Sequence, residues 1–100
     1  MTINELPKFE MYETGQQIRR SAKSARTNIV EGYGRKRYKA DFLKFLTYSH
    51  ASCDEATAQL ASLVQLYPEY KEFNLLFMAY EELGKQICSF IKYVESSWRN

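Results

Sequence analysis

The chain has few of the residues on which small catalytic, metal-binding or disulfide-linked domains depend. It contains two cysteines (Cys53 and Cys88), one histidine (His50), two prolines and four glycines in 100 residues. Two cysteines do not make a disulfide framework, and a single histidine argues against a histidine-rich metal site. No phosphate-binding glycine loop, nucleophile elbow or dinucleotide fingerprint occurs. We therefore expect no enzyme activity, no cofactor and no metal site.

Long apolar runs are also lacking. No stretch approaches the roughly 18 apolar residues of a membrane span, and the N-terminal MTINELPKFE contains no apolar signal region. We therefore expect a cytoplasmic protein without a membrane partner. The 45% of hydrophobic residues, of which aromatics are a large part, supply enough apolar side chain for one folded domain over residues 1–100.

The net charge of +2 hides an uneven distribution along the chain. Residues 1–50 carry ten Lys/Arg against five Asp/Glu, and residues 51–100 carry four against seven. The basic excess is concentrated in residues 16–45, where nine Lys/Arg face two Asp/Glu. A local excess of this size attracts phosphate backbones, although a solvated helix face has the same composition.

Apolar periodicity predicts three helices, at about 14–32, 39–66 and 70–97. In the first, a Thr14–Gln17 capping pattern follows a lead-in in which Pro7 disfavours a helix. Its stripe repeats at helical spacing and consists of Ile18, Ala22, Ala25 and Ile29. The stripe of the second helix comprises Phe42, Phe45/Leu46, Ser49, Cys53, Ala56, Leu60 and Leu63. The stripe of the third comprises Phe73, Leu76/Phe77, Tyr80, Leu83/Gly84, Ile87, Phe90/Ile91, Val94 and Trp98.

The predicted fold is an all-α, up-down helical bundle, since these ranges leave no room for strands. Three rods with wide apolar flanks in so short a chain leave some apolar surface uncovered. We expect self-association into a homo-oligomer to cover it.

The segment Asn28-Ile-Val-Glu-Gly-Tyr-Gly-Arg35 is the most distinctive in the chain. With the Gln17–Ser24 run before it, Asp41–Leu46 after it, and Ser52, Glu55, Gln59 and Leu60 in register, it resembles the four-helix bundle family linked to 23S rRNA intervening sequences. Val30 replaces an alanine of the family pattern. The likeness covers about residues 14–66.

The resemblance implies a ring-like homo-oligomer, a pentamer, from a bacterial source. Related accessory proteins of diversity-generating retroelements engage nucleic acid and a reverse transcriptase. The family pattern has a long helix before the proline-containing turn matched here to Leu6-Pro7, so the resemblance implies that this first helix is missing or shortened.

Seven basic residues are the candidate nucleic-acid-binding site: Arg19, Arg20, Lys23, Arg26, Arg35, Lys36 and Arg37. Arginine's planar fork suits phosphate. Tyr33 and Tyr38 beside the loop are candidates for stacking on bases, although tyrosines at such positions more often make packing or oligomer contacts. Two functions remain open. In the first, the chain binds RNA or DNA backbone through this basic face. In the second, it is a protein-interaction scaffold for a nucleic-acid-handling enzyme and does not itself touch nucleic acid.

The conspicuous residues of the distinctive segment have structural explanations. We expect Gly32 to form a left-handed helix cap, Glu31 to pair with Arg35, and Asn28 to bond to backbone or a neighbouring helix. His50 lacks ligand-spaced partners, and the two cysteines lie on or beside apolar stripes, where they act as small hydrophobes.

Overall fold

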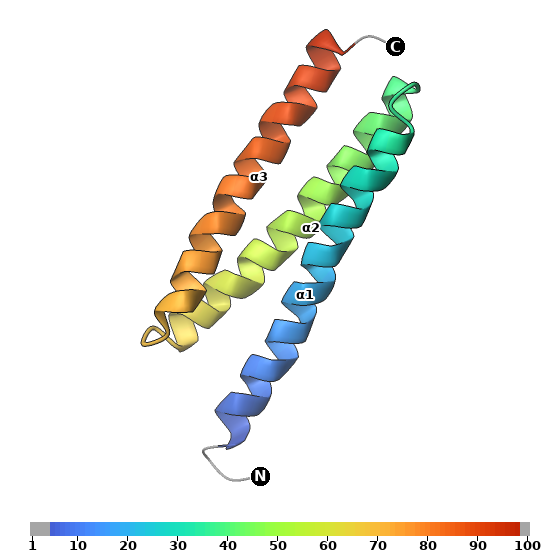
Figure 1. The fold of residues 1–100 in the computed structure, drawn as a ribbon. Helices are drawn as coiled ribbons and strands as arrows, with labels where there is room; N and C mark the ends of the chain where they lie inside the picture. The colour runs from blue at the N-terminus through green and yellow to red at the C-terminus, as the bar shows by residue number, and fades with distance from the viewer. Residues whose placement is uncertain (1–4, 99–100) are drawn as a thin grey trace.

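Three α-helices form an elongated bundle in the computed structural model, which describes residues 5–98. They are α1 (Glu5–Gly34), α2 (Lys39–Leu66) and α3 (Lys71–Ser97), joined by short loops in an up-down order (Figure 1). The described residues contain no strand. The predicted all-α bundle is confirmed, and no helix in this part of the chain is long and apolar enough to cross a membrane.

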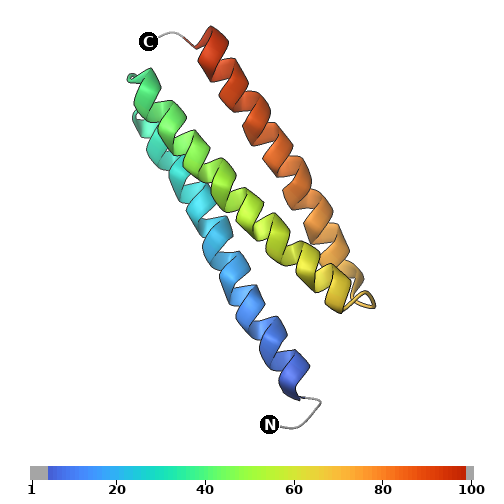
Figure 2. The same ribbon diagram turned by 180° about the vertical axis from the view of Figure 1, so that it is seen from behind.

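The central element is α2. Both α1 and α3 pack along it, and they make no close backbone contact with each other in the described chain. The two opposite views show α1 and α3 as separate flanks of α2 (Figure 2). The stripe predicted for α2 is its buried face, apart from the half-buried Phe45. Its buried residues are Phe42, Leu46, Ser49, Cys53, Ala56, Leu60 and Leu63.

The first helix begins earlier than predicted, at Glu5 rather than near residue 14. The expectation that Pro7 disfavours a helix here is wrong. Pro7 is the third residue of α1, within the first turn, where a backbone N–H has no intrahelical partner to lose. The helices predicted at 39–66 and 70–97 agree with α2 and α3 to within one residue.

The expected left-handed cap at Gly32 is wrong, since no glycine has a positive φ. Gly32 continues the helix, which ends at Gly34. The last carbonyls are instead satisfied by tighter turns, in which the N–H of Arg35 donates to Gly32 O at 2.9 Å and that of Lys36 donates to Tyr33 O at 3.1 Å.

The α1–α2 loop is tied to the far end of α3. The Trp98 indole N–H donates to the carbonyl of Lys36 at 3.2 Å, and its ring packs on Phe42 with centroids 5.2 Å apart. The Lys39 ammonium donates to the carbonyl of Glu95 at 2.7 Å. These contacts fix the position of the basic loop relative to the bundle.

Candidate nucleic-acid interface

The basic residues of α1 are exposed and uncompensated. Arg19, Arg20, Lys23 and Arg26 follow one another over about two turns of the helix, and all four side chains are exposed. None of the four forms an ion pair or a side-chain hydrogen bond with the side chains described, at residues 8–98. Their positive charge is therefore available to a partner outside the chain.

The loop residues differ from these, because two of the three have partners within the chain. Arg35 lies 3.5 Å from Glu31 Oε1, as predicted, and 3.9 Å from Asp41 Oδ2, and it stacks over the Phe45 ring at 5.2 Å. Both ion pairs are about half exposed and so contribute little to stability. Arg35 therefore serves partly to hold the loop against α2.

Lys36 engages Tyr33 through both its hydroxyl and its ring. Its ammonium donates to the Tyr33 hydroxyl at 2.7 Å and lies 3.9 Å from the ring centroid. This hydrogen bond, with the positive charge of Lys36, lowers the pKa of Tyr33 below its ordinary value. Arg37 is exposed and has no ion pair or side-chain hydrogen bond with the side chains described, at residues 8–98.

The two tyrosines beside the loop are exposed, Tyr33 at 55% and Tyr38 at 63%. Lys36 already lies over Tyr33, whereas Tyr38 has no ring contact with the rest of the described chain. Tyr38 is thus the tyrosine better placed for stacking on a base.

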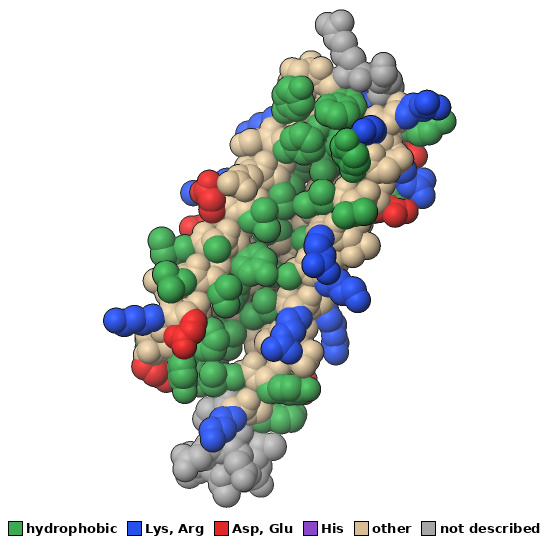
Figure 3. All heavy atoms as spheres, in the orientation of Figure 1, with side chains coloured by type: hydrophobic (Ala, Val, Ile, Leu, Met, Phe, Trp, Pro, Cys, Tyr) green, Lys and Arg blue, Asp and Glu red, His purple; other side chains and the backbone are tan. Residues whose placement is uncertain are grey.

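The structure divides the seven predicted residues into two groups. Arg19, Lys23 and Arg26 line a long groove between α1 and α3, and Arg20 and the three loop residues do not. The space-filling view shows the groove as an apolar band between the two helices, with basic side chains along α1 (Figure 3).

Sequence reasoning missed this groove, although it had predicted uncovered apolar surface. Ile29 belongs to the stripe predicted for α1, yet it is 37% exposed and lines the groove, as does the neighbouring Val30. Periodicity identified the apolar positions of α1 and α3. It did not indicate that α1 and α3 would both pack on α2 and leave their facing flanks apart.

The other singled-out residues have local partners. Asn28 donates from its side-chain amide to the carbonyl of Ser24 at 2.8 Å, one of the two alternatives expected for it. His50 Nδ1 lies 3.4 Å from Asp54 Oδ2 on the same helix, so the expectation that it lacks an acidic partner at helical spacing is wrong. Cys53 is buried and Cys88 is half-buried. Among the side chains that the structure describes, at residues 8–98, no group of three or more His, Cys, Asp or Glu could bind a metal ion.

Comparison with known proteins gives one family. The family model described as 23S rRNA-intervening sequence protein matches residues 1–89. No curated protein and no solved structure matches the chain significantly.

Proposed function

The chain belongs to the 23S rRNA-intervening sequence protein family, and from this premise we propose that it binds the phosphate backbone of RNA or DNA through α1 and the loop after it. The proposed interface consists of the seven basic residues Arg19, Arg20, Lys23, Arg26, Arg35, Lys36 and Arg37. It acts by binding alone, without catalysis.

The observation that carries this proposal is that five of these seven cations are uncompensated. Arg19, Arg20, Lys23, Arg26 and Arg37 are exposed and have no carboxylate partner among the described residues. Cations that serve only to hold a fold together are paired or packed, as Arg35 is. Unpaired cations can each contact a phosphate without first breaking an ion pair within the protein. Such contacts favour binding, because they release condensed counterions from the nucleic acid.

The proposal includes self-association in the cytoplasm. The expected assembly is a pentamer, as the family resemblance implies. Large apolar side chains remain exposed on all three helices, among them Val30 at 67%, Leu66 at 63% and Leu75 at 66%. Covering such side chains between copies stabilises a chain too small to bury them itself. A ring of copies would also repeat the basic face of α1.

The alternative is a scaffold that holds a nucleic-acid-handling protein and does not bind nucleic acid itself. The groove favours this second function, because three of the seven cations lie beside apolar walls suited to a protein surface. The two functions share Arg19, Lys23 and Arg26. They are separated by Arg20 and Arg37, which do not line the groove.

The test is fluorescence anisotropy of a labelled structured RNA with the wild-type protein and three charge-reversal variants. Arg20→Glu and Arg37→Glu are each expected to weaken binding about tenfold, with unchanged thermal unfolding. Lys85→Glu on α3 is the matched control, since it removes an exposed cation outside the proposed interface, and its effect should be small. Equal loss of affinity in all three variants, or no binding by the wild type, would contradict the proposal.

A further inference from the structure

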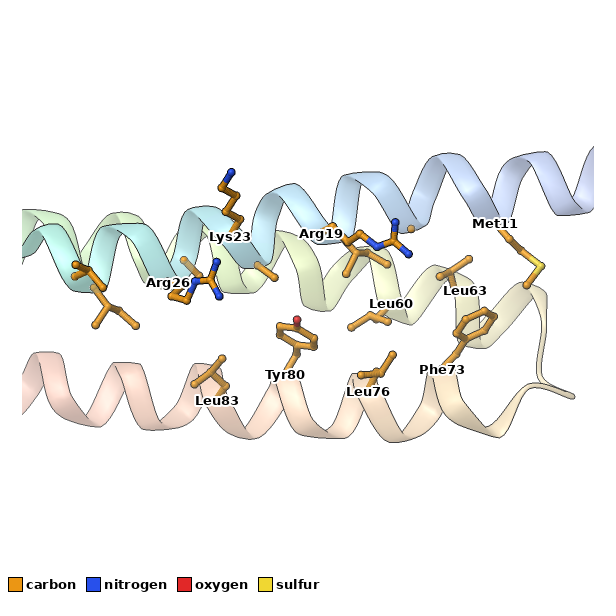
Figure 4. A pocket seen from close by; sticks show the side chains of 16 residues that line it. Met11, Arg19, Lys23, Arg26, Leu60, Leu63, Phe73, Leu76, Tyr80 and Leu83 are labelled. Atoms are coloured by element: carbon orange, nitrogen blue, oxygen red, sulfur yellow. The ribbon is translucent and has the colours of Figure 1, made fainter.

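The groove between α1 and α3 has the form of a site for a helix. Its floor is formed by Leu60 and Leu63 of α2, and its volume is about 780 Å³. The wall on the α3 side is apolar and consists of Phe73, Leu76, Tyr80 and Leu83. On the α1 side small residues widen it at Gly15, Ala22 and Ala25. Side chains from all three helices converge on this space (Figure 4).

The groove is also long enough for a helix. A second hollow of about 360 Å³, lined by Tyr33, Phe42 and Phe90, shares Ile29 and Val30 with the first and extends it along the bundle. The two together run from Met11 to Tyr33 on α1. At 1.5 Å per residue this is about 33 Å, the length of a helix of roughly 20 residues.

Charge is present on one edge of the groove only. Arg19 and Arg26, one heptad apart, extend along the edge of α1 that faces α3, and the Lys23 ammonium points outward from the rim between them (Figure 4). None of the residues that line the two hollows is an Asp or a Glu. An occupant therefore meets cations on the α1 side and apolar surface on the α3 side.

We propose that the groove binds an amphipathic helix of another protein, with an apolar stripe on the floor and carboxylates seven residues apart facing Arg19 and Arg26. Such helices dock in apolar grooves through residues at i, i+3, i+4 and i+7. Carboxylates at heptad spacing would lie on the flank of that stripe and meet both guanidiniums.

A second copy of this chain fits the groove less well. No two Asp or Glu residues anywhere in the sequence are seven residues apart, so none of its helices can present that pair. Bare nucleic acid also fits less well, because its phosphates leave the apolar floor and the α3 wall uncovered. The combination of a long apolar groove and a one-sided basic edge favours an acidic helix of a partner protein.

The test uses two fluorescently labelled peptides of about 20 residues. Both have the same Leu/Ala heptad stripe, and the flanking positions are Glu in one and Lys in the other. We expect the Glu peptide to bind the wild-type protein about tenfold more tightly than the Lys peptide. The double variant Arg19→Glu/Arg26→Glu should reverse this preference.

Two further variants test the apolar part of the site. Leu76→Asp places a charge in the groove and should weaken binding of the Glu peptide at least about tenfold. Met78→Asp is the matched control, since Met78 is similarly exposed on α3 but does not line the groove. Gly15→Leu fills the groove from α1, where a Cβ meets nothing within 4 Å, so it should block the peptide in a folded protein.

Three results would overturn the proposal: equal affinity for the two peptides, no binding of either, or equal effects of Leu76→Asp and Met78→Asp. Because the peptide assay contains no nucleic acid and Arg20 and Arg37 lie outside the groove, its outcome is independent of the RNA titration. If copies of the chain already occupied the groove, neither peptide would bind. That result would also overturn the proposal.

Discussion

Gly32 of α1 lies directly against Phe45 of α2, so that a methyl group at Gly32 would stand 3.0 Å from the Cβ of Phe45 and 3.3 Å from Cδ1 of Phe42. The contact brings the C-terminal part of α1 close to the start of α2. Phe45 Cβ is bonded to the backbone of α2, so it cannot move aside unless the helix moves. The absence of a side chain at residue 32 thus positions the helix that carries the basic residues.

Gly32→Ala is expected to destabilise the protein. Overpacking a close contact costs about 1–3 kcal/mol, and the gain in helix propensity returns up to about 1 kcal/mol. We expect a net loss of about 1 kcal/mol in the free energy of unfolding, measured by urea denaturation. Gly15→Ala is the matched control. A Cβ there meets nothing within 4 Å, so this variant should gain up to about 1 kcal/mol. A gain of stability in both variants would contradict the proposed role of Gly32.

A buried hydrogen bond joins α2 to α1 in the middle of the bundle. The Ser49 hydroxyl is fully buried and donates to the carbonyl of Ala25 at 2.8 Å. Ser49→Ala should lower the free energy of unfolding by about 1 kcal/mol. Thr47→Ala is the control, because that hydroxyl is exposed and bonds within its own helix. Its effect should stay within about 0.5 kcal/mol. Equal effects in the two variants would show that the buried Ser49 hydrogen bond adds no more stability than an exposed bond within one helix.

Cys53 should react slowly with an alkylating reagent in the folded protein. Burial raises the pKa of its thiol above the ordinary value of 9.0, and the negative charge of Asp54 adds to this, whereas the hydrogen bond with Thr57 opposes it. The reactive thiolate is therefore scarce at neutral pH. With iodoacetamide, the half-buried Cys88 should be modified first, and Cys53 only as the protein unfolds. Equal rates for the two thiols in the folded protein would contradict this expectation.

The same pKa shift predicts a pH dependence of stability. The folded protein holds the Cys53 proton more tightly than the unfolded chain does, so this contribution is complete below the unfolded pKa near 9.0. It is lost as the pH rises through the higher folded pKa. Denaturation of wild type and Cys53→Ala at neutral pH and above pH 9 should show a decline that the variant lacks. A parallel decline in both would assign the effect to other groups.

Trp98 should couple α3 to the basic loop. It donates to the Lys36 carbonyl and packs on Phe42. Trp98→Phe keeps an aromatic ring and removes the hydrogen bond, so it should cost about 1 kcal/mol. Trp98→Ala also removes the packing and should cost more, about 2 kcal/mol or above. Thermal unfolding measures both, and equal losses would mean that the ring contributes nothing beyond its N–H.

The sequence predicted the interior of the bundle better than its ends. The face of α2 was predictable because Phe42, Leu46, Cys53 and Leu60 follow a helical period, and that helix packs on both sides. The start of α1 was not predictable, because a proline interrupts a helix at most positions but is tolerated in the first turn. Nothing in the local sequence shows that Pro7 falls in that turn. The role of Gly32 depends on Phe45, a partner on another helix that no local pattern identifies.

The candidate site was predictable as a set of residues but not as an arrangement. The sequence identified Arg19, Lys23 and Arg26 as an exposed basic cluster and did not show that they line an apolar groove. Nor did it show that Arg35 forms ion pairs with Glu31 and Asp41, whereas Arg37 forms none with the side chains described. These distinctions arise from the packing of α1 and α3 on α2, which periodicity leaves open.

The salt dependence of RNA binding tests the central proposal most directly. The dissociation constant of a labelled structured RNA would be measured by anisotropy from low to physiological salt. If several unpaired cations contact phosphates, the logarithm of the association constant should fall linearly as the logarithm of the salt concentration rises. The slope should lie between about −2 and −5. Arg20→Glu should make the slope shallower by about one or more. Binding that does not weaken with salt, or no binding at low salt, would contradict a phosphate-binding role for α1.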